Sequence, residues 1–349
     1  MPRDTSKSRR IQATHGLRQA DGGVRNRGMG SVTLRRIAVV GAGAMGASLA
    51  AIVSPHVPTV IVVRRPERAQ RIRDHGIQLL GKLEASGRPE VASSIADLAH
   101  ISPIDLVFIA TKTTAIPAVC AAMRPHLADL PYVVSYQNGI EPGRAIIAAL
   151  GTPRVLRMVL HYGATIDTPA SADSPLTVRV TLHEPPHMVG GEGDALDVAT
   201  ALAPVIDQMG LPMRFTPDIE TATWQKSIAN AAGNSVAALA RLPLGKLLDS
   251  PARALIERLL DEGIAVARAA DIRLPPDYRD RVLSHMARGG GHLPSMAEDV
   301  LAGRVTEVTQ LNEQIARRGG ELGIATPTHD TVIDLIRTFD WQAAQSGKF

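Results

Sequence analysis

The feature that most constrains this chain is a glycine-rich turn between a short apolar run and a helical one. Residues 34–40 form a β-branched run typical of a strand buried on both faces, and residues 47–52 follow with a helical composition. The turn between them reads Gly41, Ala42, Gly43, Ala44, Met45 and Gly46. In such a unit Gly41 would make the tight turn, Gly43 would admit a pyrophosphate, and Gly46 would let the helix pack closely. The pattern predicts a dinucleotide-binding unit, with the free amides of the helix N-terminus facing the phosphates.

A second apolar strand is predicted at residues 59–63, and the residues after it bear on the choice of cofactor. An acidic side chain there would bind the ribose 2′-hydroxyl of NAD, whereas this chain has Arg64 and Arg65. A planar guanidinium binds a 2′-phosphate through two parallel hydrogen bonds, so the pair favours NADP (NADPH). The alternatives are that one or both arginines are solvated loop residues, and that Glu67 reaches the ribose.

Two further strands predicted in this half end in polar side chains. Lys112 follows the strand at residues 105–110, and Asn138 follows the strand at residues 132–135. Ligands of parallel α/β sheets lie beyond the carboxyl ends of the strands, so both residues are candidates for cofactor and substrate contacts. Equally, Lys112 can be a solvated lysine and Asn138 part of an ordinary Asn-Gly turn. Residues 176–189 are expected to add two strands as a hairpin.

The pattern becomes helical from Asp218 onward. A long helix predicted at residues 219–240 carries Lys226, Asn230 and Asn234 at intervals of four residues, which places them along one face. The rest of this helix is largely apolar, so it should be buried and its polar side chains need partners. A partly buried lysine has a lowered pKa and can exchange protons, which favours a functional row. Polar packing between elements is the alternative.

Two polar residues later in the chain have an ambiguous setting. Ser295 can be a helix N-cap, a ligand donor or both, and Glu307 is by default a surface carboxylate. The eleven histidines are scattered and the sequence has no metal-binding or nucleophile motif, so no metal is expected. Aromatic residues make up only 3% of the chain, which argues against a nucleic-acid partner held by base stacking.

The positive charge of the chain is concentrated at its start. Residues 1–30 contain seven basic and two acidic side chains, a charge of +5 against +4 for the whole chain, so the remainder carries −1. Residues 1–33 are expected to be a disordered basic tail: a tail without function, a transit peptide, or a stretch upstream of a true start at Met29. A single cysteine, Cys120, and the lack of any run of about 18 apolar residues predict a cytoplasmic chain that spans no membrane.

Together these patterns predict two domains. Residues 34–217 should form an α/β, Rossmann-type N-terminal domain that binds NADP. Residues 218–349 should form an all-α C-terminal domain that carries the substrate-binding and catalytic residues. The apolar helices of the second domain are compatible with a homodimer.

Over residues 34–339 the chain resembles the ketopantoate reductase (2-dehydropantoate 2-reductase) family. The segments that carry the resemblance, in order, are residues 41–46, 111–112, 137–139, 224–230, 294–296, 304–307 and 322–327. The resemblance implies a Rossmann-type domain joined to a helical one, NADPH as the cofactor, and a small-molecule 2-keto acid as the substrate.

The resemblance also implies a role for each candidate residue. Lys226 would be the general acid that protonates the substrate oxygen while NADPH delivers hydride, and Glu307 would bind the substrate hydroxyl and position the lysine. Arg65 matches the family's NADP-selecting position better than Arg64 does. The resemblance implies that the substrate is contacted by Asn138, Asn230, Asn234, Ser295 and Lys112. Lys112 would also lie near the cofactor.

The chain departs from the family pattern close to Glu307. Thr309 stands where the family has an aspartate, and Glu313 where it has a glycine. The expected function is NADPH-dependent reduction of 2-dehydropantoate to pantoate. A reductase of a different 2-oxo acid and a non-catalytic NADP-binding sensor are the alternatives.

Overall fold

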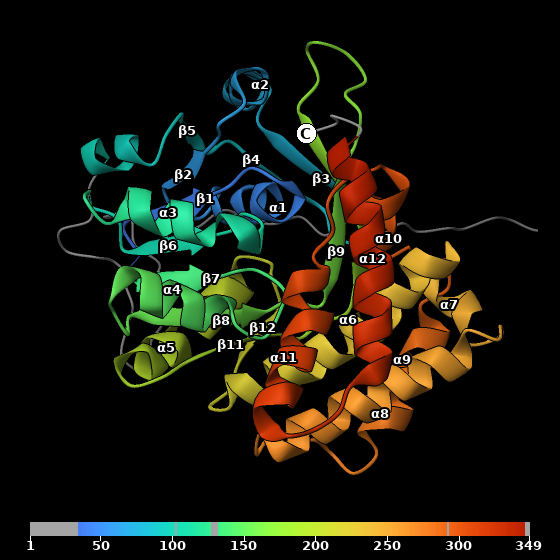
Figure 1. Ribbon diagram of the computed structural model, residues 1–349. Helices are drawn as coiled ribbons and strands as arrows, with labels where there is room; N and C mark the ends of the chain where they lie inside the picture. Colours follow the sequence, from blue (N-terminus) through green and yellow to red (C-terminus); the bar gives the residue numbers. More distant parts are fainter. Residues whose placement is uncertain (1–33, 102, 127–131, 292, 346–349) are drawn as a thin grey trace, which may run out of the picture.

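The computed structural model describes residues 34–101, 103–126, 132–291 and 293–345, so the predicted tail at residues 1–33 lies outside the described residues. Within these ranges, eight strands form one large sheet with helices on both faces (Figure 1). From edge to edge the strands are β12 (Met213–Phe215), β11 (His187–Gly191), β8 (Val155–Val159), β7 (Tyr132–Ser135), β6 (Leu106–Ile109), β1 (Ile37–Val40), β2 (Thr59–Val62) and β5 (Glu90–Ala92). Neighbours pair in parallel except β11 with β8, so β11 and β12 run against the rest.

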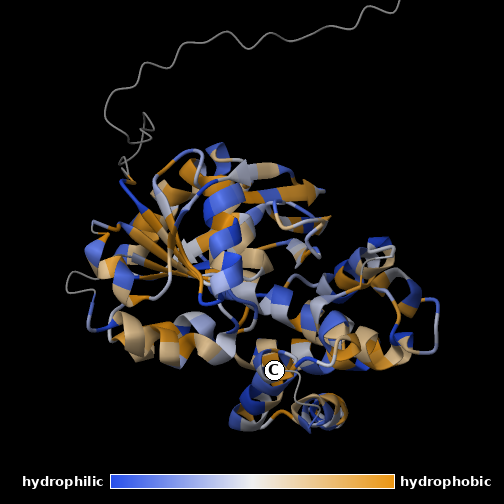
Figure 2. Cartoon of the chain, turned by 90° about the horizontal axis from the view of Figure 1, so that it is seen from above, coloured by the Kyte–Doolittle hydropathy of each residue, from blue (hydrophilic) through white to orange (hydrophobic). Residues whose placement is uncertain are grey.

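β1 lies well inside this sheet, and its side chains are buried on both faces. Ile37 and Val39 pack into one core with α1 (Ala44–Val53), whereas Ala38 and Val40 pack into another with α3 (Ile116–Met123). A strand covered on both faces needs apolar residues at every position, which is why the run is continuous. Figure 2 shows the sheet strands as predominantly apolar. The other helices of this part are α2 (Pro66–His75), α4 (Pro142–Leu150) and α5 (Asp194–Gln208).

A second sheet packs against the first through α1. Over the described residues it has four strands, in the order β4 (Ala85–Gly87), β3 (Ile77–Gly81), β10 (Leu176–His183) and β9 (Tyr162–Ile166). α1 contacts strands of both sheets and so lies between them. The hairpin predicted at residues 176–189 is wrong, because β10 pairs with β3 and β9 while β11 pairs with β8 and β12. The chain passes from the small sheet to the large one at this point.

From α6 (Ile219–Ala240) onward the described chain is helical and packs around a core of its own. The following helices are α7 (Leu244–Leu247), α8 (Arg253–Ala269), α9 (Tyr278–Arg288), α10 (Ser295–Leu301), α11 (Asn312–Leu322) and α12 (Pro327–Gln345). Short 3-10 turns occur at η1 (Ala96–His100), η2 (Thr113–Ala115) and η3 (Val308–Gln310). α6 contacts α8 and α10 and also β8 and β11 of the large sheet (Figure 1). The predicted fold class, an α/β Rossmann-type part followed by a helical part, is confirmed.

Candidate active site

The glycine turn between β1 and α1 leaves its backbone open to a ligand. Gly41 has a φ of +113°, and a Cβ there would lie 2.9 Å from the Thr111 side chain. A Cβ on Gly46 would lie 1.9 Å from the Gly41 carbonyl oxygen, so the helix packs directly on the turn. Apart from chain neighbours, no described residue lies within 4 Å of a Cβ at Gly43, and no described side chain caps α1. Free amides at an open helix N-terminus fit the pyrophosphate of a dinucleotide.

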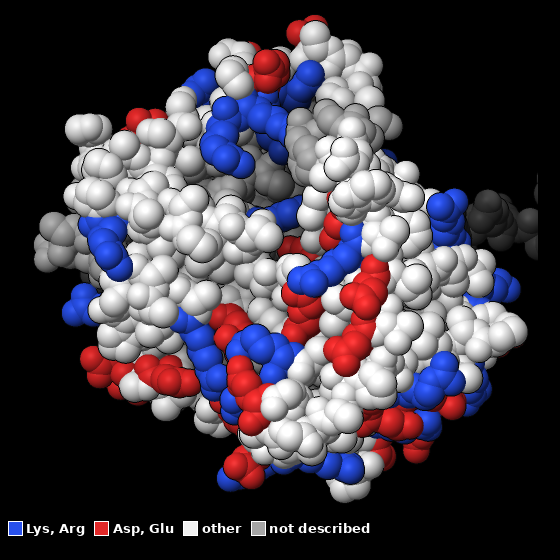
Figure 3. All heavy atoms as spheres, viewed as in Figure 1, with Lys and Arg blue, Asp and Glu red and all other residues white. Residues whose placement is uncertain are grey.

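Arginines gather where β2 leads into α2. Arg64 and Arg65 are exposed, and Arg65 immediately precedes α2. Arg68, in the first turn of α2, is half-buried and donates from Nη1 to the Ala42 carbonyl oxygen at 2.8 Å. Burial, and then the charge of Arg65, lower the pKa of the Arg68 guanidinium. Figure 3 shows basic side chains gathered over α2 beside a hollow in the surface.

Arg68 is a residue that sequence reasoning missed. Its spacing was the available signal, because it lies three residues after Arg65 at the start of a helix and so on the same side. Together the two arginines place positive charge next to the glycine turn. The setting fits a dinucleotide that carries an extra phosphate on its ribose.

A cavity of about 370 Å³ lies between the small sheet and the helical part. Its walls come from β9, β10, α6, α9 and the start of α10. Five of the predicted site residues line it: Asn138, Lys226, Asn230, Asn234 and Ser295. Much of the remaining wall is apolar and includes Leu244, Val282, Met286 and Leu293. The polar row of α6 therefore faces one cavity, together with the residue that follows β7.

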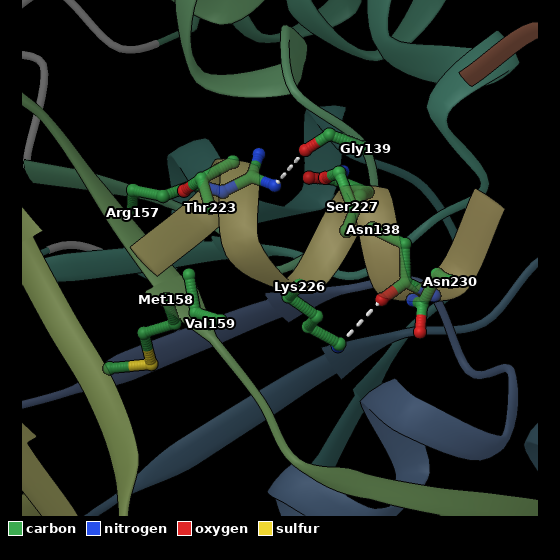
Figure 4. A pocket seen from close by; sticks show the side chains of 10 residues that line it. Asn138, Gly139, Arg157, Met158, Val159, Thr223, Lys226, Ser227 and Asn230 are labelled. Atoms are coloured by element: carbon green, nitrogen blue, oxygen red, sulfur yellow. Dashed lines mark hydrogen bonds between the residues drawn. The ribbon is translucent and has the colours of Figure 1, made fainter. Parts of the chain in front are cut away.

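The Lys226 ammonium lies at the edge of this cavity. Its Nζ donates to Asn138 Oδ1 at 2.8 Å, and Figure 4 shows the side chain extending from α6 toward the Asn138 turn. Burial and, to a smaller extent, the charge of Arg157 lower the pKa of Lys226 to about 7, while the charge of Glu307 opposes the change. The ammonium can thus give up a proton near neutral pH.

Glu307 is half-buried and is not the surface carboxylate that the sequence alone favours. Burial raises its pKa, while Lys112, the Asn138 side chain and Lys226 each favour the ionised form. The Asn138 amide accepts from Lys226 and hydrogen-bonds Glu307, so its two ends serve an ammonium and a carboxylate. Asn138 therefore couples the candidate proton donor to the candidate carboxylate.

Lys112 lies outside the cavity lining and links the two parts of the molecule. Its Nζ donates to Asp299 Oδ2 at 3.3 Å and to the Val305 carbonyl oxygen at 3.0 Å. Arg304 Nε donates to the other oxygen of Asp299 at 2.7 Å. The end of β6 is thereby tied to the segment between α10 and Glu307.

Ser295 is the first residue of α10 and is exposed toward the cavity. Pro294 takes the N-cap position, so Ser295 does not act as the N-cap. The two departures from the family pattern lie away from the cavity lining. The Thr309 hydroxyl accepts from Gln310, and Glu313 forms a salt bridge with Arg337 at 2.5 Å.

The described residues contain neither a candidate membrane span nor a candidate metal site. None of their helices is long and apolar enough to cross a membrane. No group of three or more of their histidine, cysteine and acidic side chains is arranged to hold a metal ion.

Two protein-family models match the chain. The model described as "Ketopantoate reductase PanE/ApbA" matches residues 37–184, and the one described as "Ketopantoate reductase PanE/ApbA C terminal" matches residues 218–340. The 2-dehydropantoate 2-reductase of Caulobacter vibrioides is 31% identical, over 86% of this chain and 97% of its own length. That of Mesorhizobium japonicum is 27% identical over the same shares.

Solved structures agree on the fold. A PanE/ApbA family ketopantoate reductase from Ralstonia eutropha JMP134 is 25% identical, with a TM-score of 0.77 over 88% of this chain and 99% of that one. D-mandelate dehydrogenase in a ternary structure with NADH and anilino(oxo)acetate is 21% identical, with the same TM-score and shares. The two family models together cover most of the chain, and so this chain belongs to the ketopantoate reductase family of oxidoreductases.

Proposed function

We propose that this protein reduces 2-dehydropantoate (ketopantoate) to pantoate with NADPH, and that Lys226 is the general acid. The observation that carries the proposal is the half-buried Lys226 ammonium, held by Asn138 at the edge of the cavity with a pKa near neutrality. We also propose residues 34–217 as the cofactor domain and residues 218–349 as the substrate domain, which meet at this cavity.

The glycine turn and the arginines fit the cofactor. The open amides of α1 would hold the pyrophosphate, and Arg65 with Arg68 would hold a ribose 2′-phosphate. Lys112 and Asn138, at the ends of neighbouring strands, would lie near the nicotinamide. When bound, NADPH supplies the hydride that reduces the substrate's ketone carbon.

The residues of the cavity, together with Glu307 just outside its lining, would stabilise the charge and transfer the proton. Negative charge grows on the ketone oxygen during reduction, and the Lys226 ammonium both stabilises it and donates the proton that completes the hydroxyl. Glu307 would accept a hydrogen bond from the substrate hydroxyl and, through Asn138, keep the lysine in place. Asn230, Asn234 and Ser295 would orient the rest of the substrate by hydrogen bonds from the cavity wall.

Substituting Lys226→Ala tests the proposal. We expect kcat for ketopantoate reduction to fall by about 10²–10⁴-fold, the usual contribution of a positioned general acid, while NADPH still binds. Stopped-flow absorbance at saturating NADPH measures the first quantity and fluorescence titration the second. Lys246→Ala, an exposed lysine of α7, is the matched control. Unchanged turnover in Lys226→Ala would exclude Lys226 as the acid.

The cavity is also compatible with a different substrate. Its volume and its apolar wall leave room for a 2-oxo acid with a larger side chain than ketopantoate, in line with the anilino(oxo)acetate bound by the similar D-mandelate dehydrogenase. A panel of 2-oxo acids separates the cases. Turnover of ketopantoate alone supports our proposal, and turnover of only a bulkier acid moves the substrate but keeps the chemistry. Tight NADPH binding with no turnover of any acid would favour a sensor.

A further inference from the structure

Arg157 is a buried arginine to which the reaction described so far gives no role. It lies in the middle of β8 and is only 8% exposed. Its Nη1 donates to Ser135 Oγ at 2.9 Å, and its Nη2 donates to the Gly139 carbonyl oxygen at 2.6 Å. Among the described residues its Nε has no hydrogen-bond partner, and no carboxylate neutralises its charge.

Both partners of Arg157 belong to the turn that presents Asn138. Ser135 ends β7 and donates to Gln137 Oε1, which also accepts from the Tyr136 amide. Gly139 has a φ of +102°, and a Cβ there would lie 2.5 Å from the Gln310 carbonyl oxygen. The turn is therefore held by the hydrogen bonds from Arg157 and by close packing against Gln310 of η3. Asn138, in the middle, can hold its amide against Lys226.

Arg157 also shares a second, much smaller hollow with the candidate acid. The residues that line this hollow include Asn138, Arg157, Thr223, Lys226 and Asn230. Figure 4 shows Arg157 reaching Gly139 and Lys226 reaching Asn138, two neighbouring residues of the turn. Two positive charges thus lie near each other inside the protein. The charge of Arg157 therefore favours loss of a proton from Lys226.

Hydrogen bonding alone does not explain an arginine here. A buried charge without a carboxylate is costly, and a neutral amide could donate to the Gly139 carbonyl at lower cost. If Arg157 served only to stabilise the fold through hydrogen bonds, its Nε would also be expected to have a hydrogen-bond partner. Compared with a neutral amide, the guanidinium brings a positive charge, and this charge lies next to Lys226.

We propose that Arg157 is a positioning residue for the reduction: it holds the Asn138 turn against Lys226 and places a fixed positive charge beside the ammonium, so that Lys226 releases its proton readily. The proposal rests on Lys226 acting as the acid. It adds to that function a residue on a different element, β8, which lies outside the lining of the large cavity.

The other titratable groups near Lys226 do not supply an equivalent positive charge near neutral pH. Glu307, before η3, is the opposing carboxylate. His161 approaches from the connection between β8 and β9, and His187 from the start of β11. Burial lowers the pKa of His161 to about 4 and that of His187 to about 3, so both histidines are neutral near pH 7. The more distant cavity wall carries Glu184, Tyr278, Arg281, His285 and Glu298. Near neutral pH, Arg157 and Glu307 therefore set the charge balance at Lys226.

The test compares pH profiles of kcat for Arg157→Gln, which removes the charge, and Arg157→Lys, which keeps it. In Arg157→Gln we expect the descending limb of the pH profile, which we assign to Lys226, to move up by about one pH unit, a tenfold change in the acid constant. On the plateau below this limb kcat should fall several-fold, because a weaker acid donates its proton less readily. In Arg157→Lys the limb should stay in place while kcat falls, because a lysine has one nitrogen in place of the separate Nη1 and Nη2 that bind Ser135 and Gly139. Arg179→Gln, an exposed arginine of β10, should behave as wild type. A limb unmoved in Arg157→Gln overturns the proposal.

A second variant keeps the test decisive if Arg157→Gln does not fold. Ser135→Ala removes one partner of the guanidinium and leaves the charge, so kcat should fall several-fold with the limb unmoved. Wild-type kcat in Ser135→Ala would overturn the positioning role.

A measurement without turnover separates this inference from the proposed reaction. The chain has six lysines, so NMR of ¹³Cε-labelled lysine can identify the Lys226 signal by its loss in Lys226→Ala. The Lys226 signal should titrate about one unit higher in Arg157→Gln than in wild type, whether or not ketopantoate is the substrate. Equal titration in the two proteins would overturn the role of the charge, even if the enzyme reduces ketopantoate.

Discussion

At the scale of single residues, the chemistry of this site comes from side chains whose properties their surroundings change. Lys226 would be an ordinary cation in water, but burial and Arg157 bring its pKa to about 7. Glu307 is changed in the opposite sense, since burial raises its pKa while neighbouring cations hold the ionised form. Both groups also contact one amide, that of Asn138. A change in the protonation of one group should therefore alter the pKa of the other.

The pKa of Lys226 sets the expected pH dependence of both directions of the reaction. In the proposed mechanism reduction needs the protonated lysine, so kcat/KM for ketopantoate should fall as the pH rises through about 7. Oxidation of pantoate needs the neutral amine as a base and should rise over the same range. Initial rates in both directions between pH 5.5 and 9 measure this. A forward rate that stays flat up to pH 9 would contradict the assignment.

Arg65 and Arg68 are the residues that we propose bind the 2′-phosphate of NADPH. Arg65→Ala should weaken NADPH binding by roughly 10–100-fold, the value of one to two charge-assisted hydrogen bonds, and change NADH binding by less than threefold. Fluorescence titration with each cofactor measures this. Arg73→Ala, at the far end of α2, serves as the control. Equal losses for NADPH and NADH would remove the 2′-phosphate assignment.

At the scale of elements, α6 brings the site residues together. Its period puts Lys226, Asn230 and Asn234 on one side, and its contacts with both β8 and α8 hold that side at the junction of the two parts. Asp218 begins the helix, and its carboxylate accepts a hydrogen bond from the Thr221 amide at 3.0 Å. The placement of the row therefore depends on a helix whose start is held independently of the cavity.

Loss of the Asp218 cap should destabilise the protein without disabling it. Asp218→Ala should cost about 1 kcal/mol. That corresponds to a fall in Tm of about 2–4 °C. Asp218→Asn, which can still accept the Thr221 hydrogen bond, should melt close to wild type. Differential scanning calorimetry compares the two, and identical melting of Asp218→Ala and Asp218→Asn would show that the cap is not stabilising. Because Lys226 lies two turns further on, kcat at 25 °C should stay within twofold of wild type.

At the scale of the whole molecule, the site lies where two sheets and a helical part meet. The small sheet supplies one wall of the cavity, α6 and α9 supply others, and Lys112 ties the large sheet to the segment after α10. A ligand that contacts all of these should stabilise their mutual arrangement.

Asp299 is the anion in the link between the parts. It receives Lys112 from one side and Arg304 from the other, and Asp299→Asn keeps its shape but removes its charge. We expect a loss on the order of 1 kcal/mol, since both cations are half exposed to water. The loss should shrink in 1 M NaCl, which screens the pairs. Urea unfolding at low and high salt measures it, with the exposed Asp249→Asn as the control. A loss independent of salt would show that charge is not its cause.

The sequence by itself determined what local patterns encode. The strand and glycine turn of residues 34–46, the long helix with its polar row, and the α/β-then-helical order all follow from spacing and apolar period, and the fold class is confirmed. The candidate residues Lys226, Asn138 and Glu307 came from this pattern and from the resemblance to a family. Their roles stay predictions, although the structure brings all three together.

Only the tertiary structure decided which distant segments meet. The second sheet, the separation of β10 from β11, and the half-buried setting of Glu307 depend on contacts between residues far apart in the chain, for which no local period exists. Arg157 shows the reason most clearly. In the sequence it is one arginine in an apolar run. In the folded chain β8 places its guanidinium, which has no carboxylate partner among the described residues, against the turn of Asn138 and near Lys226. Electrostatic effects depend on distance in space and on burial, and folding alone sets both.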